Sequence, residues 1–249
     1  MFWREEHSSA YQLLRAPAAK IWSEEERNWL NELSCFRTSN WIPERLLLDC
    51  FLRYFEVDRA LFREALRIVA VISFRLKLID NGQLGDLGGR CSFRGERWLE
   101  PDCTISQFTS ALRALYVDDF SLMERFQQAH FNLKKTKRKE LARYLLCKLE
   151  QRRAGGSIDW EMVTRSKGCT LEHINPNWEG IGNLTLMRFA LNNGLGASKY
   201  EDKREHYQTS QFHITREIAR RYARFEEAQI SQRKEEIAKQ ICQIWRIDF

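Results

Sequence analysis

The sequence lacks the cysteine patterns of secreted and zinc-binding proteins. No two of its cysteines form a Cys-x-x-Cys pair, and their number is odd. The seven cysteines stand at positions 35, 50, 91, 103, 147, 169 and 242. A scattered set of this kind argues against a disulfide framework or a zinc ribbon. We therefore expect reduced thiols and a cytoplasmic protein.

Long apolar runs and nucleotide-binding loops are also missing. The longest apolar run, Ile68–Ile72, is far shorter than the roughly 20 residues that a membrane-spanning helix needs. Nothing near the start has the pattern of a signal peptide. A glycine cluster within residues 82–95 has neither a Gly-x-Gly-x-x-Gly pattern nor a P-loop lysine. These absences predict no membrane association and no phosphate-binding loop in this cluster.

The composition is that of a globular protein with an excess of positive charge. Hydrophobic residues make up 43% and charged residues 30% of the 249 residues. A chain of this length can bury a sizeable core, as one large domain or two small ones. The net charge of +6 suits a polyanionic partner such as DNA, although charge alone is weak evidence for one.

Helical patterns dominate the chain. Ser23 and Glu26 have the spacing of a capping box that opens a helix through about Phe36. The segment 58–79 is apolar on more than one side, which predicts a helix at the centre of a bundle. Apolar spacing in 214–245 predicts one or two amphipathic helices. The expected fold is mainly α, with a helical region over residues 1–130 and a second region over 131–249.

One segment, LEHINPNWEGIGNLTLMRFALNNGLGASKY at 171–200, concentrates the polar residues that sites use. Glu172 and His173 are adjacent, so their side chains point to opposite faces of an extended strand. A turn at residues 176–180 and a returning strand at 181–186 predict a hairpin with His173 on one arm and Asn183 on the other. A short helix is expected over residues 188–192.

These motifs resemble a known nuclease domain. The order Glu-His-Ile-x-Pro, Ile-Gly-Asn-Leu-Thr-Leu, Leu-Asn and Lys-Tyr is similar to the HNH nuclease domain at the C-terminus of GmrSD-type (type IV) restriction enzymes, which also occurs in SspE-like phage-defence proteins. The resemblance extends upstream to Arg143 and downstream to Trp245. It implies a small ββα-metal fold near the C-terminus, set among helices.

The resemblance also implies a role for each residue of the motif. His173 matches the general base, Glu172 the carboxylate that binds a divalent metal, and Asn183 the residue that braces the hairpin. Asn192 stands where the third HNH residue usually binds the metal. Two departures are visible, because many HNH sites have Asp in place of Glu172 and His in place of Asn192. Oxygen ligands of this kind favour Mg²⁺ or Mn²⁺ over zinc.

Two further features have both a functional and a structural interpretation. Lys199 is predicted either to meet the charge on a scissile phosphate or to be a surface residue. The most basic run of the chain indicates DNA phosphate contacts or simply a solvated helix start. Its basic residues are Lys134, Lys135, Lys137, Arg138 and Lys139.

Together these features predict a divalent-metal-dependent HNH endonuclease that nicks or cuts DNA by phosphodiester hydrolysis. The resemblance places it as the effector of a restriction or anti-phage defence system that acts on foreign or modified DNA. Relatives usually carry a nucleotide-hydrolysing sensor with an Asp-Gly-Gln-Gln-Arg-type motif, which this sequence lacks, so we expect such a domain or subunit as a partner. The alternatives are a non-catalytic nucleic-acid-binding or docking module, in which Glu172 and His173 are ordinary strand residues, and an RNA-cleaving HNH toxin.

Overall fold

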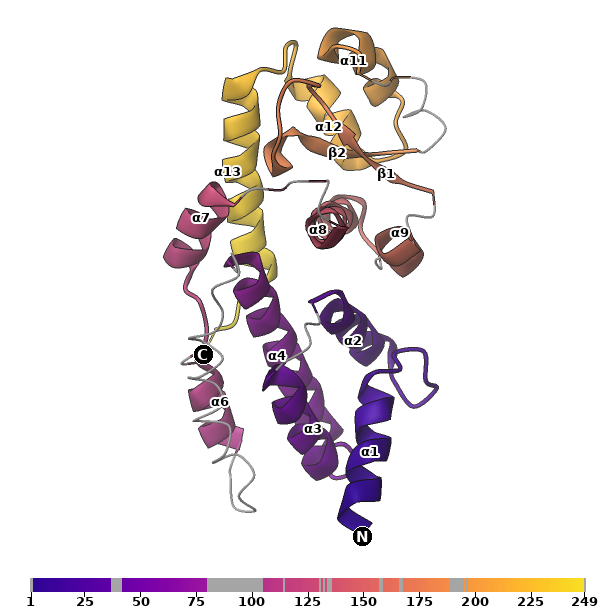
Figure 1. Cartoon of the computed structure of the whole chain (residues 1–249), viewed down its shortest axis with the longest axis vertical. Helices are drawn as coiled ribbons and strands as arrows, with labels where there is room; N and C mark the ends of the chain where they lie inside the picture. Colours follow the sequence, from indigo (N-terminus) through magenta and orange to yellow (C-terminus); the bar gives the residue numbers. More distant parts are fainter. Residues whose placement is uncertain are drawn as a thin grey trace. The chain divides into compact units, whose positions relative to one another are not determined.

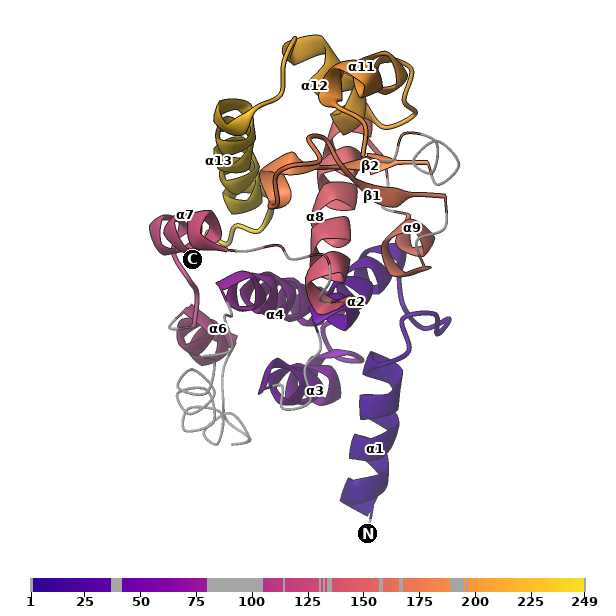
Figure 2. The same ribbon diagram turned by 45° about the horizontal axis from the view of Figure 1, so that its top comes forward.

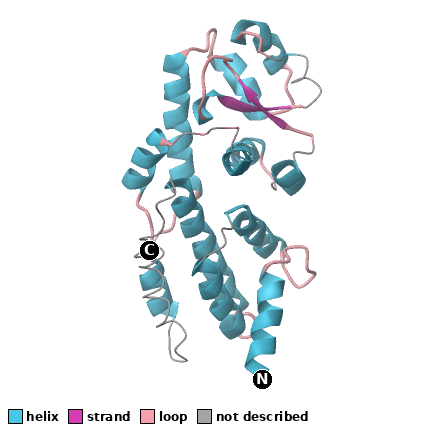
Figure 3. Ribbon diagram, in the orientation of Figure 1, coloured by secondary structure: helices cyan, strands magenta, loops and turns pink. Residues whose placement is uncertain are grey.

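The structure is a computed structural model. It describes residues 2–36, 42–79, 105–113, 115–129, 131, 133, 136–156, 159–165, 168–188, 195 and 197–248. These residues are mainly helical, with one two-stranded antiparallel sheet (Figures 1 and 3). The prediction of a mainly α protein is thereby confirmed. The glycine cluster at 82–95 and the helix expected over 188–192, apart from Arg188, lie outside the described residues.

The chain divides into two compact units. Unit 1 comprises residues 1–126 together with 242–249, and unit 2 comprises residues 127–241. The helices of unit 1 are α1 (Phe2–Leu14), α2 (Glu24–Phe36), α3 (Ile42–Tyr54), α4 (Arg59–Ile79), α6 (Ile105–Arg113) and the greater part of α7 (Asp119–Gln128). No described helix has both the length and the apolar composition needed to cross a membrane.

The capping box predicted at the start of α2 is confirmed. The Glu26 backbone N–H donates to Ser23 Oγ at 3.3 Å, and the Ser23 N–H donates back to Glu26 Oε2 at 2.8 Å. The Glu26 carboxylate is also paired with Arg59, at 2.6 Å from Nε to Oε1. A local sequence signal thus fixes the helix start, and a long-range ion pair then ties α2 to α4.

Helix α4 forms the centre of unit 1, as its apolar pattern predicts. Every side chain from Ile68 to Leu76 is buried, and the helix packs against α2, α3 and α6. At its C-terminal half the fully buried Arg75 guanidinium donates to the carbonyl oxygens of Val117 and Trp245, at 2.6 and 2.5 Å, and to Asp119 Oδ1 at 2.6 Å. This cation therefore serves as an internal tie between distant segments of unit 1.

Unit 2 contains the hairpin and the helices around it. Its described elements are α8 (Thr136–Ala154), α9 (Trp160–Arg165), β1 (Thr170–His173), the 3-10 turn η2 (Ile181–Asn183), β2 (Leu184–Met187), α11 (Tyr200–Gln208), α12 (His213–Arg221) and the greater part of α13 (Glu227–Ile244). The two last helices fulfil the prediction of amphipathic helices over 214–245. Gly155 directly follows α8, and its φ of 76° is the left-handed conformation that glycine adopts without strain.

The predicted hairpin is confirmed, with one correction at its turn. Strands β1 and β2 pair antiparallel, with Glu172 opposite Thr185 and His173 opposite Leu184. Residues 181–183 form the 3-10 turn instead of the first part of the returning strand, so Asn183 lies just before β2 and not within it. Helices α8 and α12 both pack against β2 and against each other, so together they support the hairpin (Figures 1 and 2).

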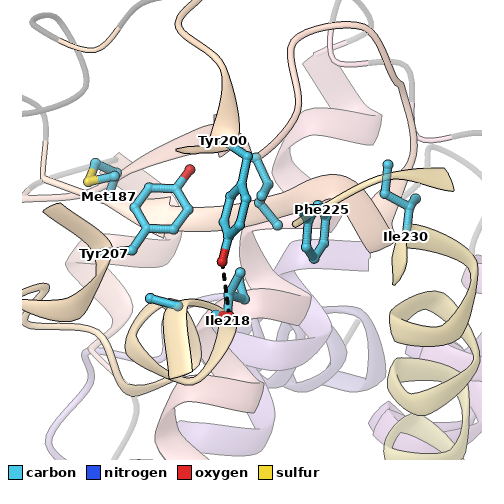
Figure 4. Packing of buried hydrophobic residues seen from close by; sticks show 8 residues of the cluster. Met187, Tyr200, Tyr207, Ile218, Phe225 and Ile230 are labelled. Atoms are coloured by element: carbon cyan, nitrogen blue, oxygen red, sulfur yellow. Dashed lines mark hydrogen bonds between the residues drawn. The ribbon is translucent and has the colours of Figure 1, made fainter. Parts of the chain in front are cut away.

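A small aromatic cluster supports the hairpin (Figure 4). The ring of Tyr200 lies against Phe225, with centroids 5.5 Å apart, and the Tyr200 hydroxyl donates to the carbonyl oxygens of Ile218 and Tyr222. The buried cluster consists of Ile174, Met187, Tyr200, Tyr207, Ile218, Ala219, Phe225 and Ile230. It joins β2, and the residue that follows β1, to α11, α12 and α13.

Helix α12 is fixed at its N-terminus by a carboxylate of α8. The backbone N–H groups of His213 and Ile214 donate to Glu150 Oε1 and Oε2, at 2.8 and 2.9 Å. Two otherwise unsatisfied helix donors are thereby paired with a negative charge, which the positive end of the helix dipole favours. One residue further on, Thr215 Oγ1 donates to the Leu186 carbonyl oxygen at 2.6 Å, which binds α12 to β2.

Candidate active site on the hairpin

His173 is the last residue of β1 and the predicted general base. Its side chain is half-buried, and loss of solvent is the main cause that lowers its pKa below the ordinary value of 6.5. The charge of Lys203 lowers this pKa further, whereas the exposed carboxylate of Glu179 raises it. The imidazole is therefore neutral at physiological pH, the form that can accept a proton.

Asn183 holds the loop that follows His173. Its side chain is fully buried, with Oδ1 accepting the Asn175 N–H at 2.8 Å. Its Nδ2 donates to the carbonyl oxygens of Asn175 and Trp178, at 2.7 and 2.5 Å. The Asn183 backbone carbonyl accepts the Ile174 N–H at 2.9 Å. The amide thus closes the loop onto the turn.

Helix α13 covers the other side of this turn. The buried Arg233 guanidinium donates through Nη1 to the Gly182 and Leu184 carbonyl oxygens, both at 2.7 Å. Burial lowers the Arg233 pKa to about 10, so the cation persists at neutral pH. A Cβ added at Gly182 would lie 2.2 Å from the Ile230 carbonyl oxygen of α13. Only glycine fits at this close approach between the turn and the helix.

Substituting Gly182 with alanine is expected to destabilise unit 2 by about 1–3 kcal/mol, because the added methyl group meets backbone instead of a flexible side chain. Urea denaturation of the variant measures this loss as a lower midpoint. Ser231→Ala, at an exposed position of the same helix, is the control and is expected to leave the midpoint unchanged. Equal midpoints for Gly182→Ala and the control would contradict the observed packing.

Glu172, the predicted metal ligand, lies in a buried ion pair. Its Oε1 accepts a hydrogen bond from Lys203 Nζ at 2.5 Å, and the two side chains are only 5% and 1% exposed. Burial raises the pKa of the Glu172 carboxyl, while the Lys203 ammonium opposes that rise. Lys203 Nζ also donates to the His173 carbonyl oxygen at 2.8 Å. The ammonium of α11 therefore holds two consecutive residues of β1.

The described residues do not form a metal site around Glu172. Its carboxylate is already neutralised by Lys203, and its side chain leaves the strand on the face opposite His173. Within the part of the chain that the structure describes, no three His, Cys, Asp or Glu side chains are grouped as a metal ion requires. Asn192, the second predicted ligand, lies outside that part.

The remaining predicted site residues lie in different surroundings. Lys199 is exposed and precedes the first residue of α11. Lys134 and Lys135 lie outside the described residues. Lys137 lies in α8, and its side chain is outside the described part of the structure. Arg138 is half-buried and Lys139 exposed in the first turns of that helix. The structure thus brings together His173, Asn183 and Glu172 within one hairpin, and it leaves the DNA-contact residues as predictions.

Sequence reasoning missed Lys203 and Arg233, the two cations that hold the hairpin. Arg233 stands among the many charged residues of α13, and nothing local distinguishes it from them. Lys203 does carry a signal, because Tyr200, Lys203 and Tyr207 have the spacing of one helical face and all three are buried. A lysine between two aromatic residues on an otherwise polar helix indicates a buried partner for its charge.

Residues 117–240 match the family model described as GmrSD restriction endonucleases, C-terminal domain. The match contains α8, the whole hairpin and α11 to α12, so it covers every residue of the candidate site. It confirms the predicted resemblance: the chain contains a C-terminal domain of the GmrSD restriction endonuclease family. The family indicates a nuclease role for this domain. No curated protein matches the chain.

Proposed function

We propose that this protein is a divalent-metal-dependent DNA endonuclease of the HNH type, with His173 as its general base. The family match over residues 117–240 carries the proposal, because it spans the segment in which a neutral, half-buried histidine ends a braced strand. The hairpin followed by α11 has the order of a ββα motif. DNA is the substrate that the family and the net positive charge favour.

The chemical step that we propose is hydrolysis of one phosphodiester. His173 takes a proton from a water molecule, the water oxygen attacks phosphorus in line, and the bond from phosphorus to the 3′ oxygen breaks. Asn183 keeps the loop after His173 in place, so that the imidazole has a fixed position relative to the substrate. Lys199, which is exposed, is proposed to meet the negative charge that develops on the phosphate.

Mg²⁺ or Mn²⁺ is the proposed cofactor, with Asn192 as the ligand that the resemblance supplies. When bound, such an ion polarises the scissile phosphate and stabilises the leaving oxygen. We expect supercoiled plasmid to be nicked or linearised by the protein in Mg²⁺ or Mn²⁺ and left intact in excess EDTA, with activity restored by metal. Agarose gel electrophoresis measures this, and cleavage that persists in EDTA would contradict the requirement for metal.

A non-catalytic nucleic-acid-binding module is the second candidate function. The observation that favours it is the pairing of Glu172 with Lys203 in place of a described metal cluster. Binding of DNA in a gel-shift assay, without cleavage at any metal concentration, would support this module. Cleavage of RNA in preference to DNA, in a competition between the two, would instead identify an RNA-cutting nuclease.

The low pKa of His173 predicts a specific pH dependence. The base must be unprotonated, so cleavage is retained above the folded-state pKa and is lost as the pH falls through it. Because burial lowers this pKa, we expect the acid limb of kcat/KM to lie below the ordinary histidine value of 6.5. A pH–rate profile with saturating metal measures the limb, and a midpoint above 6.5 would contradict the proposed environment of His173.

The biological role that we propose is defence against foreign or modified DNA, as the effector of a restriction system. The family name supports restriction, and the basic run at residues 134–139 supplies candidate phosphate contacts. A nucleotide-hydrolysing sensor, as a further domain or a separate subunit, is the proposed partner. Nucleotide-dependent stimulation of cleavage on adding such a partner would support this arrangement.

A further inference from the structure

The Glu172–Lys203 pair joins the two structural elements that the candidate site depends on. Lys203 Nζ lies 2.5 Å from Glu172 Oε1 and 2.8 Å from the His173 carbonyl oxygen. The ammonium comes from α11, 31 residues further along the chain, and both side chains are almost completely buried. A lysine with two anionic or polar oxygen partners at these distances has the contacts that a buried cation requires.

Other parts of the protein cover the face of the hairpin that carries Glu172. Glu172 pairs across the sheet with Thr185, so both side chains leave the hairpin on the same face. The Thr185 hydroxyl is 2.7 Å from the hydroxyl of Thr215 on α12, and it is fully buried. Helices α11 and α12 thus cover this face, whereas the His173 side chain leaves on the other.

From this geometry we infer that Glu172 is the buried counter-ion of Lys203, and that it does not bind the catalytic metal. The ammonium of Lys203 supplies inside the fold the positive charge that a metal ion was expected to supply at this carboxylate. The pair fixes β1 at His173 to α11. The inference rests on the proposed function only because that function makes the position of His173 important. It implies that any bound metal ion has ligands other than Glu172.

A double-mutant cycle tests the pairing. The variants are Glu172→Met, Lys203→Met and the double variant, with Tyr207→Phe as a matched control on the same buried face of α11. The Tyr207 hydroxyl has no hydrogen-bond partner among the described residues, so its removal is expected to be neutral. Each single variant leaves one buried charge unpaired, which is expected to shift the unfolding equilibrium by about 10²- to 10³-fold.

The double variant is expected to recover at least about tenfold of the summed loss, because replacing both partners of a buried pair by apolar groups is often nearly neutral. Unfolding in urea, followed by circular dichroism, measures the parent and all four variants. Strictly additive losses would overturn the pairing. If neither single variant folds, a folded double variant supports the pairing and an unfolded double variant overturns it.

Metal binding is measured separately, by titration of the folded full-length protein with Mn²⁺ in a calorimeter and without DNA. We expect Glu172→Met to bind Mn²⁺ within about threefold of the parent, since removing a true ligand costs more than the 10- to 100-fold typical of outer-shell partners. A loss of tenfold or more in folded Glu172→Met protein overturns the inference. If the parent binds no Mn²⁺, the double-mutant cycle alone decides whether Glu172 and Lys203 form the proposed pair. The proposed metal dependence then fails independently of that pairing.

Discussion

Replacing His173 with alanine is expected to lower the rate of plasmid cleavage by about 10²- to 10⁴-fold, the contribution usually made by a general base. The half-buried imidazole ends β1, where its low pKa keeps it neutral and able to accept a proton from water. Its side chain is not part of the buried apolar core. The substitution is therefore expected to remove the proton acceptor and to leave the fold intact.

The measurement compares parent and variant at several concentrations of Mg²⁺ and Mn²⁺. His206→Ala is a suitable control, because His206 is an exposed histidine on α11 in the same unit. The control is expected to cleave at the parental rate, and all three proteins are expected to unfold at the same urea concentration. Equal nicking by His173→Ala and parent protein would exclude the general-base role, while parallel loss in both variants would point to a defect unrelated to His173.

Substituting Asn183 with alanine is expected to destabilise unit 2 by roughly 3 kcal/mol or more, because several buried groups would lose their partners together. The Asn175 N–H and the Asn175 and Trp178 carbonyl oxygens all bond to this one amide. The side chain is 0% exposed, so water cannot replace it without opening the turn. We expect cleavage to fall as well, because the loop after His173 would lose its brace.

Asn177→Ala is the matched control for this variant. Asn177 lies in the same loop but is exposed, and it is expected to change stability by less than about 0.5 kcal/mol. Asn183→Asp adds a second comparison, since it keeps the acceptor for the Asn175 N–H but places an oxygen against two carbonyl oxygens. Denaturation midpoints rank the four proteins, and a midpoint for Asn183→Ala equal to that of Asn177→Ala would contradict the bracing role.

The sequence was a good guide wherever the determining interactions are local. The capping box at Ser23 and Glu26 is set by residues a few positions apart, and it was predicted correctly. The alternation around Glu172 and His173, with the glycine turn that follows, likewise predicted the hairpin. Family resemblance added proposed roles for residues but no positions for them in space.

The sequence was a poor guide to the buried cations. Arg75, Lys203 and Arg233 would each be expected on the surface from composition alone, yet each pairs with oxygen atoms more than 30 residues away. Such contacts depend on tertiary packing, which no local pattern records. Asn183 illustrates the same limit, because its amide selects a 3-10 turn where the apolar spacing predicts strand.

The carboxylate of Glu150 has a consequence for how this domain tolerates change. It holds the start of α12, and Thr215 at the first turn of that helix in turn binds β2. Strand β2, which pairs with the strand of His173, is therefore held in place by Glu150, an acid that lies before both strands in the sequence and is not expected to meet any substrate. Random mutagenesis under selection for cleavage is expected to reject substitutions at Glu150 almost as often as substitutions at His173 itself.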